Sequence, residues 1–312
     1  EWWPDNSAAL EIQSQSCCHE SIRRLFLLSR DWRECIQHLS EFHKKWGCGI
    51  FARYKAFVWE HQGGEGYLRG VENPDPITLS DLIGYEAERS EVINNTLQLL
   101  DGFPANNVLL TGARGTGKSS LVKALLTEYA DRGLRLVEME KADLVDLPDV
   151  LACLETRPER FIVFVDDLSF EEGEPAYKML KSVLDGSVWA QPDNVLLYAT
   201  SNRRHLMPEF FHENEGARHV GEEVHPAEAV EEKISLSERF GLWVSFYPFS
   251  QEEYLTIVAH WLRSFGAGEV EIEAARPEAL QWAIERGSRS GRVAWQFARD
   301  WAGRHGLLRQ DA

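Results

Sequence analysis

The stretch TGARGTGKSS, residues 111–120, decides the fold. It contains the pattern G-x-x-x-x-G-K-[ST] from Gly112 to Ser119, directly after the apolar run NVLL (107–110) and before a helix-like stretch. A strand, a glycine-rich turn and a helix in this order are typical of a phosphate-binding loop, because the backbone N–H groups can surround a phosphate at the positive end of the helix. We expect Lys118 to reach the β- and γ-phosphates and the Ser119 hydroxyl to bind Mg²⁺. The alternative, a glycine-rich turn without a ligand, fits this context poorly.

The segments around this loop alternate between strand-like and helix-like patterns. Nearly continuous apolar runs predict strands that are covered on both faces. The predicted strands are NVLL (107–110), LRLVEM (134–139), FIVFV (161–165) and NVLLYAT (194–200). Helical stretches lie between them, for example 119–133 and 175–186, each ended by a glycine. The sequence therefore predicts an α/β fold with a doubly wound parallel sheet.

Polar side chains follow two of these strands. Asp166 and Asp167 come directly after FIVFV, and Thr200, Ser201 and Asn202 end the next predicted strand. Ligands of open α/β sheets bind at the carboxyl ends of the strands, so Asp166 suits a Mg²⁺ shell and Asp167 the orientation of an attacking water. Taken alone, two aspartates favour a turn or a helix cap equally well, and Ser and Asn favour ordinary turns. The phosphate-binding loop upstream favours the functional interpretation.

The ends of the chain differ from the middle. Apolar residues at three- and four-residue steps predict a long amphipathic helix from Ser21 to Trp46, within a helical N-terminal region, 1–62. Residues 21–55 hold eight Lys or Arg against three acids, either a solvated helix face or a patch for a partner or a nucleic acid. Glycines and prolines predict a linker over 63–78.

Helical patterns return after Pro248. The stretches 250–266, 277–287 and 290–306 predict helices, the first with Ser250 and Glu253 at capping-box spacing. We therefore divide the chain into an N-terminal helical region (1–62), a linker (63–78), an α/β core (79–248) and a small α-helical lid (249–312).

Composition sets limits on function. A formal net charge of −17 excludes a surface that binds polyanions throughout, so any nucleic-acid contact must be local. Cys17, Cys18, Cys35, Cys48 and Cys153 lack the spacing of a zinc site and fit reduced, mostly buried thiols. No apolar run approaches the ~18 residues that would span a bilayer. We expect a cytoplasmic protein without membrane contact, although the first residue is Glu1 and a targeting segment could precede it.

Several longer stretches carry a family resemblance. They are DLIGYEAERSEVINNT, PANNVLLTGARGTGKSSLVKALL, DDLSFEEGEPAYKMLKSVLDG, YATSNRRHLMPE, EEKISLSERFGLWVSFYPF and RSGRVAWQFA. Together with the order of the motifs they resemble the AAA+ ATPases, and more narrowly a bacterial and cyanobacterial AAA+ ATP-binding family of unknown function. The resemblance runs from about residue 77 to 303 and is loose over residues 1–60.

The resemblance implies roles for individual residues. It implies adenine contacts at Ile83 and Gly84, a sensor 1 residue at Asn202, and an arginine finger at Arg239 that reaches into a neighbouring subunit's site. Arg292 fits the sensor 2 position of the lid best, with Arg289 as the alternative. The residues implied to bind ATP or ADP are Ile83, Gly84, Gly112, Ala113, Arg114, Gly115, Thr116, Gly117, Lys118, Ser119, Ser120 and Arg292. Ser119 and Asp166 are implied to bind Mg²⁺. The implied catalytic residues are Lys118, Asp167, Asn202, Arg239 and Arg292.

The chain also departs from the AAA+ pattern. The acidic strand of most AAA+ enzymes ends in Asp-Glu, whereas this chain has Asp166-Asp167, and the shorter second carboxylate favours slower hydrolysis. The segment MEKADLVDLPD has neither the aromatic residue nor the glycine of polypeptide-threading loops. Residues 205–238 hold nine glutamates against two basic residues, either a solvated loop or an insertion that binds a protein.

Three functions remain open from the sequence. We expect an oligomeric ATPase that remodels or loads a protein client, through the acidic 205–238 segment or the N-terminal region. One alternative is a nucleotide-gated switch with little hydrolysis, suggested by the short Asp167. The other is a nucleic-acid-associated ATPase, suggested by the basic 21–55 region and by the lid arginines Arg286, Arg289, Arg292, Arg299, Arg304 and Arg309.

Overall fold

The computed structural model describes residues 16–170, 174–186, 191–202, 236 and 238–307. Within these residues a seven-stranded sheet forms the core, in the order β2-β1-β4-β5-β6-β3-β7. Its strands are β1 (Ala56–Gln62), β2 (Glu65–Val71), β3 (Val108–Gly112), β4 (Leu134–Glu138), β5 (Arg160–Val165), β6 (Val195–Ser201) and β7 (Leu242–Phe246). Only β1 and β2 pair antiparallel; the other described pairs are parallel. The predicted α/β fold with a doubly wound parallel sheet is confirmed.

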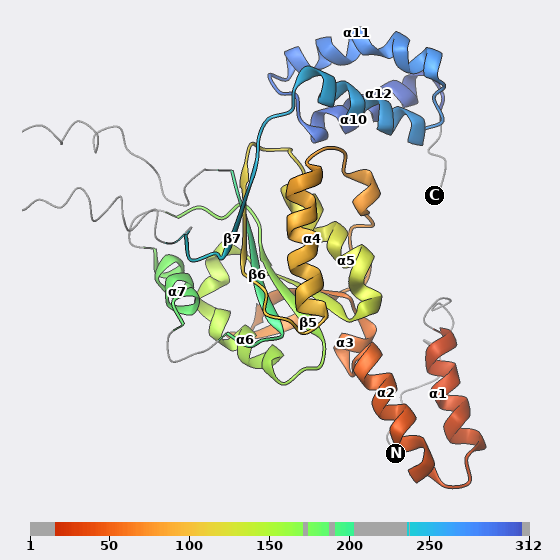
Figure 1. Ribbon diagram of the computed structural model, residues 1–312, viewed down its shortest axis with the longest axis vertical. Coiled ribbons are helices and arrows are strands. Elements are labelled where there is room, and N and C mark those ends of the chain that lie inside the picture. The colour runs from red at the N-terminus through yellow and green to blue at the C-terminus, as the bar shows by residue number, and fades with distance from the viewer. Residues whose placement is uncertain (1–15, 171–173, 187–190, 203–235, 237, 308–312) are drawn as a thin grey trace, which may run out of the picture.

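Helices cover both faces of the sheet (Figure 1). On one face, α4 (Glu86–Leu100) and α5 (Lys118–Tyr129) bury their apolar sides against β3, β4 and β6. On the other face, α6 (Leu147–Glu155) and α7 (Pro175–Leu184) pack against β5 and β6, together with the 3-10 segment η4 (Lys141–Asp146). Strand residues alternate between the two clusters: Ile162 belongs to the cluster of α4 and α5, and Val163 to the cluster of α6 and α7, as the two-residue period of a strand requires. The sheet is therefore buried on both sides.

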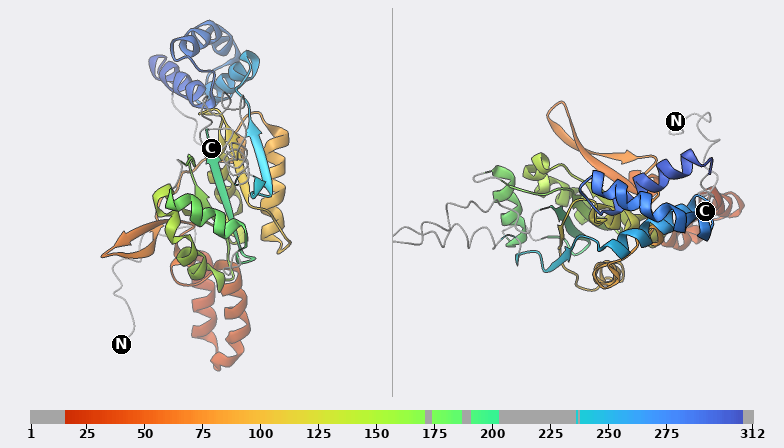
Figure 2. Two further views of the ribbon diagram at one scale, coloured as in Figure 1. Left: turned by 90° about the vertical axis from the view of Figure 1, so that its left-hand side faces the viewer. Right: turned by 90° about the horizontal axis from the view of Figure 1, so that it is seen from above.

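The lid is a separate helical layer at one end of the sheet (Figures 1 and 2). It contains α10 (Gln251–Ser264), α11 (Glu269–Glu285) and α12 (Gly291–Arg304), which share one apolar cluster. The predicted capping box is present, because the Ser250 side chain accepts from the Glu253 N–H and the Glu253 side chain from the Ser250 N–H. Helix α11 begins eight residues before the predicted start at 277 and carries Pro277 inside it. Proline disfavours a helix interior, which explains why the sequence pattern placed the start there.

The N-terminal region differs most from the sequence-based expectation. The predicted single helix from 21 to 46 is two helices, α1 (Ser16–Leu28) and α2 (Ile36–Trp46), separated by η1 (Trp32–Cys35). The Asp31 side chain accepts from the Arg33 N–H and so starts η1 with a local turn that interrupts the helix. A short helix α3 (Ile50–Arg53) then leads into β1.

Two strands lie where the sequence predicted helix and linker. Strand β1 ends the region expected to be helical, and β2 lies within the expected linker, 63–78. β2 is largely exposed and rich in glycine, whereas β1 joins the parallel sheet beside β4. The sequence pattern also missed β7, a strand of five residues, and helices α4 and α6.

Two further expectations from the sequence concern the burial of the cysteines and the absence of membrane-spanning helices. The three cysteines whose side chains the structure describes, Cys35, Cys48 and Cys153, are free, but only Cys35 is buried and Cys153 is exposed. The expectation of mostly buried thiols is therefore wrong for these three. Among the described residues, every helix is too short or too polar to cross a membrane.

Candidate functional site

A cavity of about 700 Å³ opens at the carboxyl ends of the parallel strands, between the sheet and the lid. The loop between β3 and α5 forms its floor, the segment before α4 one wall, and α10 and α12 of the lid another. The predicted residues that line it are Ile83, Gly84, Arg114, Gly115, Thr116, Gly117, Lys118, Ser119, Ser120, Asp166, Asp167, Asn202 and Arg292. Elements far apart in the sequence thus meet at one pocket, as expected at the end of a parallel sheet.

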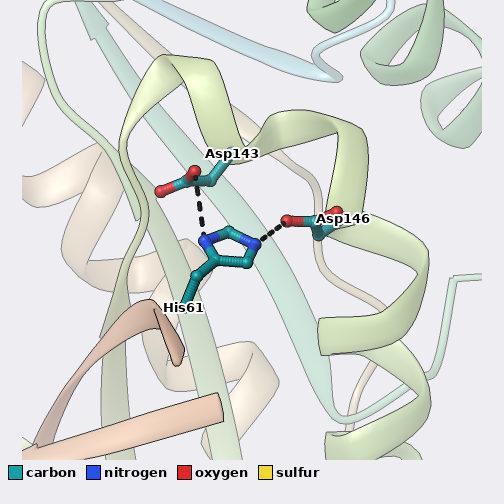
Figure 3. Close-up of side chains that lie close together, drawn as sticks. All are labelled: His61, Asp143 and Asp146. Carbon is teal, nitrogen blue, oxygen red and sulfur yellow. Dashed lines mark hydrogen bonds and ion pairs between the residues drawn. The ribbon is translucent and has the colours of Figure 1, made fainter. Parts of the chain in front are cut away.

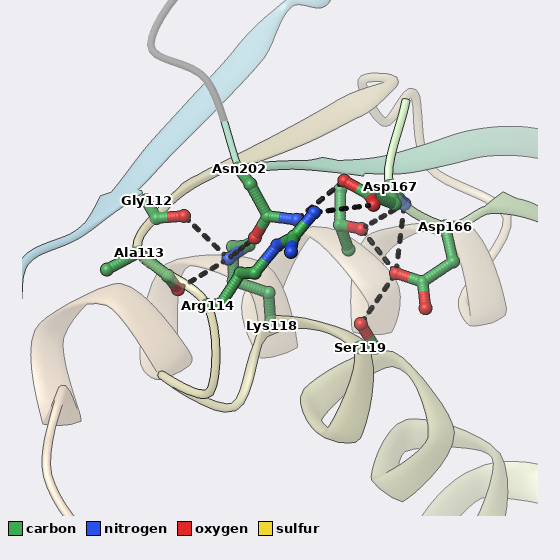
Figure 4. Close-up of polar contacts among 9 residues, drawn as sticks. Gly112, Ala113, Arg114, Lys118, Ser119, Asp166, Asp167 and Asn202 are labelled. Atoms are coloured by element: carbon green, nitrogen blue, oxygen red, sulfur yellow. Dashed lines mark hydrogen bonds and ion pairs between the residues drawn. The ribbon is translucent and has the colours of Figure 1, made fainter. Parts of the chain in front are cut away.

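Lys118 is held at the centre of the loop. Its ammonium group donates to the carbonyl oxygens of Gly112 (2.8 Å) and Ala113 (2.9 Å) and to Oδ1 of Asn202 at 3.2 Å (Figure 4). Burial lowers the pKa of this ammonium group to about 8, although the nearby Asp166 and Asp167 carboxylates act in the opposite direction. A desolvated cation that faces an open cavity is well placed to bind an anion.

The loop can take this shape because of its glycines. Gly112 has a φ of 137°, and a Cβ atom there would lie 2.0 Å from the carbonyl oxygen of Phe246 on the neighbouring strand β7. A side chain at this position would therefore push β3 and β7 apart.

Asp166 connects the loop to two strands. Its Oδ1 accepts from the Ser119 hydroxyl at 2.6 Å and from the Thr200 hydroxyl at 2.5 Å. Two oxygen ligands at adjacent positions around Mg²⁺ lie about 2.9 Å apart, so the Ser119 and Asp166 oxygens need to separate only slightly to hold the ion between them. The donor set of a hydroxyl and a carboxylate is the kind that Mg²⁺ takes, and these residues fit the ion.

Asp167 has an unusual backbone and a different environment. Its φ of 51° lies in the left-handed region, which aspartate tolerates better than most residues. Its N–H donates to the Thr200 hydroxyl, and its carboxylate accepts from Asn202 Nδ2 at 2.5 Å (Figure 4). The Arg114 guanidinium lies 3.7 Å from the other carboxylate oxygen. Asp167 therefore turns toward the loop, while Asp166 turns toward Ser119.

The lid contacts the phosphate-binding loop directly. The Gly291 N–H donates to the Gly115 carbonyl oxygen at 2.9 Å, and a Cβ atom on Gly115 would lie 2.7 Å from the Ser290 hydroxyl oxygen. Ser290 is buried and caps α12 by accepting from the Val293 N–H. This contact places Arg292, in the first turn of α12, at the cavity. Arg289, the alternative for the same role, is not among the described residues that line it.

Arg239 lies elsewhere in this chain. It forms an ion pair with Asp185, the residue that follows α7, and is not among the described residues of the cavity lining. The acidic segment 205–238 falls outside the described residues except at positions 236 and 238.

Further cavity residues escaped the sequence pattern. Asp75, Pro76 and Ile77 approach from the expected linker, and Trp261 and Trp295 approach from the lid. The apolar spacing of the lid helices predicts that some aromatic residues face inward, but it does not separate a core tryptophan from one that faces a ligand.

A glycine-rich loop after β3, acidic and polar residues at the ends of β5 and β6, and a helical lid over the cavity together define a P-loop NTPase core of the AAA+ class. The sequence model of the family described as "Protein of unknown function (DUF815)" matches residues 52–305. Because the match covers most of the chain, the protein belongs to this family.

Solved structures with a related arrangement are distant in sequence. A RuvB variant from Thermotoga maritima is 16% identical over 76% of this chain and 68% of that chain, with a TM-score of 0.46. A chain in the HORMA:CdnC:Trip13 complex from E. coli MS115-1 is 11% identical over 71% of this chain and 90% of that chain, with a TM-score of 0.45. A search of curated proteins found no match.

Proposed function

We propose that this protein binds ATP with Mg²⁺ and hydrolyses it as an oligomer, to remodel or load a protein client. One observation carries the hydrolysis proposal: Lys118, the Asp166–Asp167 pair and Asn202 form one connected polar network at the end of the cavity. Binding a nucleotide requires the loop alone, whereas the additional network supplies groups that can position a water.

Each residue of the network takes a separate task in this proposal. Lys118 neutralises the β- and γ-phosphate oxygens, and Ser119 and Asp166 hold Mg²⁺, which stabilises the charge on those oxygens. Asn202 and Asp167 orient the attacking water, and Asp167 accepts its proton. Ile83 and Gly84 contact the adenine, and Arg292 contacts the phosphates from the lid.

The oligomer is proposed from the position of Arg239. An arginine that stabilises the transition state must lie within reach of the γ-phosphate. Arg239 instead pairs with Asp185, and this favours a role in the site of a neighbouring subunit over a role in its own. Under this proposal, assembly of the subunits completes each site.

Steady-state phosphate release tests the proposal. It is measured per subunit over a range of protein concentrations at saturating Mg·ATP, for the native chain and for Arg239→Ala. We expect a rate that rises with protein concentration and falls at least ~10³-fold in the variant, the range typical of arginine fingers. A native rate that stays negligible at every concentration, with ATP bound, would overturn the hydrolysis proposal.

A second candidate is a nucleotide-gated switch with little hydrolysis. Both Asp167 carboxylate oxygens already have a partner within the chain, Asn202 for one and Arg114 for the other, so an attacking water shares the carboxylate with these two groups. This candidate predicts tight ATP binding without turnover in the same experiment.

The nucleic-acid alternative receives less support from the lid. Arg304 pairs with Glu278 and Asp300, Arg286 stacks on Trp282, and Arg299 lies over Trp295. These contacts engage the guanidinium groups within the chain.

A further inference from the structure

A second cluster of chemically active side chains lies away from the nucleotide cavity. His61, near the end of β1, sits between Asp143 and Asp146 of η4, and each ring nitrogen faces one carboxylate (Figure 3). The two segments are more than 80 positions apart in the sequence. None of these three residues lines the cavity.

On the Asp146 side of the cluster, one carboxylate oxygen has two hydrogen-bond partners. Asp146 Oδ2 lies 2.7 Å from His61 Nε2 and accepts from the indole N–H of Trp59 at 3.3 Å. An ionised carboxylate only accepts, so Nε2 carries the proton in this contact. In a neutral imidazole the lone pair is then on Nδ1.

The Asp143 side of the cluster is different. His61 Nδ1 lies 3.7 Å from Asp143 Oδ1, too far for a hydrogen bond. With the lone pair on Nδ1, two acceptors face each other across this gap, and a cation between them would resolve the repulsion. Zn²⁺ binds nitrogen and oxygen at about 2.0–2.2 Å, so two of its ligands in a tetrahedral site lie roughly 3.4 Å apart, close to the observed separation.

The role of Asp146 fits the same arrangement. Histidine ligands of metals commonly donate their other ring N–H to a carboxylate, which fixes the tautomer and orients the ring. The Asp146–His61 contact has this form, and Trp59 in turn holds Asp146. His61 is about two fifths exposed and the aspartates about a quarter, so an ion and its water ligands can reach the site from solvent.

We propose that His61 Nδ1 and Asp143 bind a divalent transition-metal ion, with Asp146 as the residue that positions the imidazole. The ion class follows from the donor set: an imidazole suits Zn²⁺, Co²⁺ or Ni²⁺, whereas Mg²⁺ and Ca²⁺ prefer oxygen ligands alone. With two protein ligands and water at the other positions, the site is a moderate-affinity one. The bound ion would join β1 to η4 and so fasten the β1–β2 hairpin to the core.

Calorimetric titration of Zn²⁺ into the tag-free full chain tests the proposal. The titration is done in excess Mg²⁺ and without nucleotide. Under these conditions Mg²⁺ competes for the oxygen ligands Ser119 and Asp166, and the Zn²⁺ signal reports the His61 cluster. We expect one Zn²⁺ per chain and a higher melting temperature with Zn²⁺ than without it. Asp146→Asn weakens binding by about 10- to 100-fold, as expected for a residue that acts through the ligand.

The variants His61→Gln and Asp143→Asn remove a ligand each. Glutamine keeps an amide N–H that can donate to Asp146, so the hairpin contact is retained while the imidazole is lost. His38→Gln, at an exposed position on α2, is the matched control and leaves Zn²⁺ binding unchanged. The proposal is overturned if the native chain binds no Zn²⁺ at submillimolar concentration, or if His61→Gln binds it as well as the native chain does. The first result would identify the cluster as a structural contact between β1 and η4 that holds no ion.

Discussion

Two neighbouring carboxylates at the end of β5 have different environments. Asp166 accepts from Ser119, Thr200 and the Asp167 N–H through a single oxygen. Asp167 is more than half exposed and is turned away by its left-handed backbone. A glutamate at position 167 would reach further into the cavity than the aspartate does. In the proposed mechanism, the left-handed backbone turn must therefore bring the shorter Asp167 side chain closer to the phosphates. We assign Mg²⁺ binding to Asp166 and proton acceptance to Asp167 because their environments differ in this way.

Asp167→Asn tests the proton-acceptor role. The amide keeps the size of the side chain and can still contact Asn202, but it cannot accept a proton from water. We expect single-turnover ATP hydrolysis to fall by at least ~10²-fold, because a positioned general base contributes about that much, while the affinity for ATP changes little. Rapid-quench measurement of one turnover, beside equilibrium titration with a fluorescent ATP analogue, separates the two quantities.

The matched control for this variant is Asp193→Asn, an exposed aspartate in the turn before β6. It makes the same chemical change away from the cavity and leaves both quantities unchanged. Undiminished turnover in Asp167→Asn would show that the proton leaves by another route, and the switch candidate would lose its structural basis as well.

At the scale of elements, the phosphate-binding loop and α12 meet through Gly115. Gly115→Ala introduces a methyl group 2.7 Å from the Ser290 hydroxyl oxygen at a residue whose φ is 79°. Strain of this kind costs about 1–3 kcal/mol, so we expect ATP affinity to fall roughly tenfold or more as the lid is displaced. Equilibrium titration with nucleotide measures the loss.

Gly303→Ala is the control for the same substitution in the same lid. Gly303 lies in the last turn of α12, and a Cβ atom there meets no atom within 4 Å. Alanine stabilises a helix interior by about 0.5–1 kcal/mol relative to glycine and a last turn by less, so this variant should melt at the same or a slightly higher temperature with unchanged ATP affinity. If both variants bound ATP equally well, the Gly115–Ser290 contact would have no part in nucleotide binding.

Tyr198 joins β6 to α4 through a buried hydroxyl. The hydroxyl accepts from Asn95 Nδ2 and lies 2.8 Å from the Thr96 hydroxyl. Burial raises the pKa of this phenol to about 12, although the two hydrogen bonds act in the opposite direction. The folded state therefore keeps the proton that the unfolded state loses near pH 10, and the stabilising contribution of the neutral phenol is lost as the pH rises from about 10 to 12.

Tyr198→Phe should therefore show a pH-dependent difference from the native chain. Near pH 8 the variant is less stable by about 1 kcal/mol, the net value of a typical hydrogen bond. At pH 11 the native chain has lost about 1.4 kcal/mol through this group and the variant has not, so the difference closes or slightly reverses. Urea unfolding at the two pH values measures it, and ionisations common to both proteins cancel. A constant difference would place the hydroxyl in contact with solvent.

Sequence patterns predicted the elements that depend on local chemistry. The P-loop, the strands β3–β6 and the Ser250 cap each carry a short pattern with a direct physical cause. The pattern failed where distant residues decide: β1 joins the sheet only because β4 offers it an edge, and Pro277 stays helical because α11 packs in the lid. Trp261 and Trp295 at the cavity, and the separate His61 cluster, depend on contacts between elements far apart in the chain, and no spacing predicts them.

At the scale of the whole molecule, the proposed mechanism divides each site between two subunits. Mixing two inactive variants tests this division. Lys118→Ala removes phosphate binding but keeps Arg239, and Arg239→Ala keeps the cavity but removes the arginine. In a mixed oligomer, the cavity of an Arg239→Ala subunit can receive Arg239 from a Lys118→Ala neighbour. If the two variants assemble at random in equal amounts, one half of the cavities are intact and one half of those have an intact neighbour. We therefore expect phosphate release to recover to roughly one quarter of the native rate per subunit.

The control mixture pairs Arg239→Ala with the double variant Lys118→Ala/Arg239→Ala, which offers no arginine to any neighbour. It should stay inactive, since the mixed oligomers then differ from the test only in Arg239. If phosphate release recovers in the test mixture and not in the control mixture, one subunit must supply Arg239 to the cavity of its neighbour, because neither chain holds a complete set of residues. If mixed oligomers form, as judged by co-purification of differently tagged chains, and still release no phosphate, then Arg239 acts within its own subunit or outside catalysis. Its pairing with Asp185 would then be a structural contact between α7 and the segment before β7.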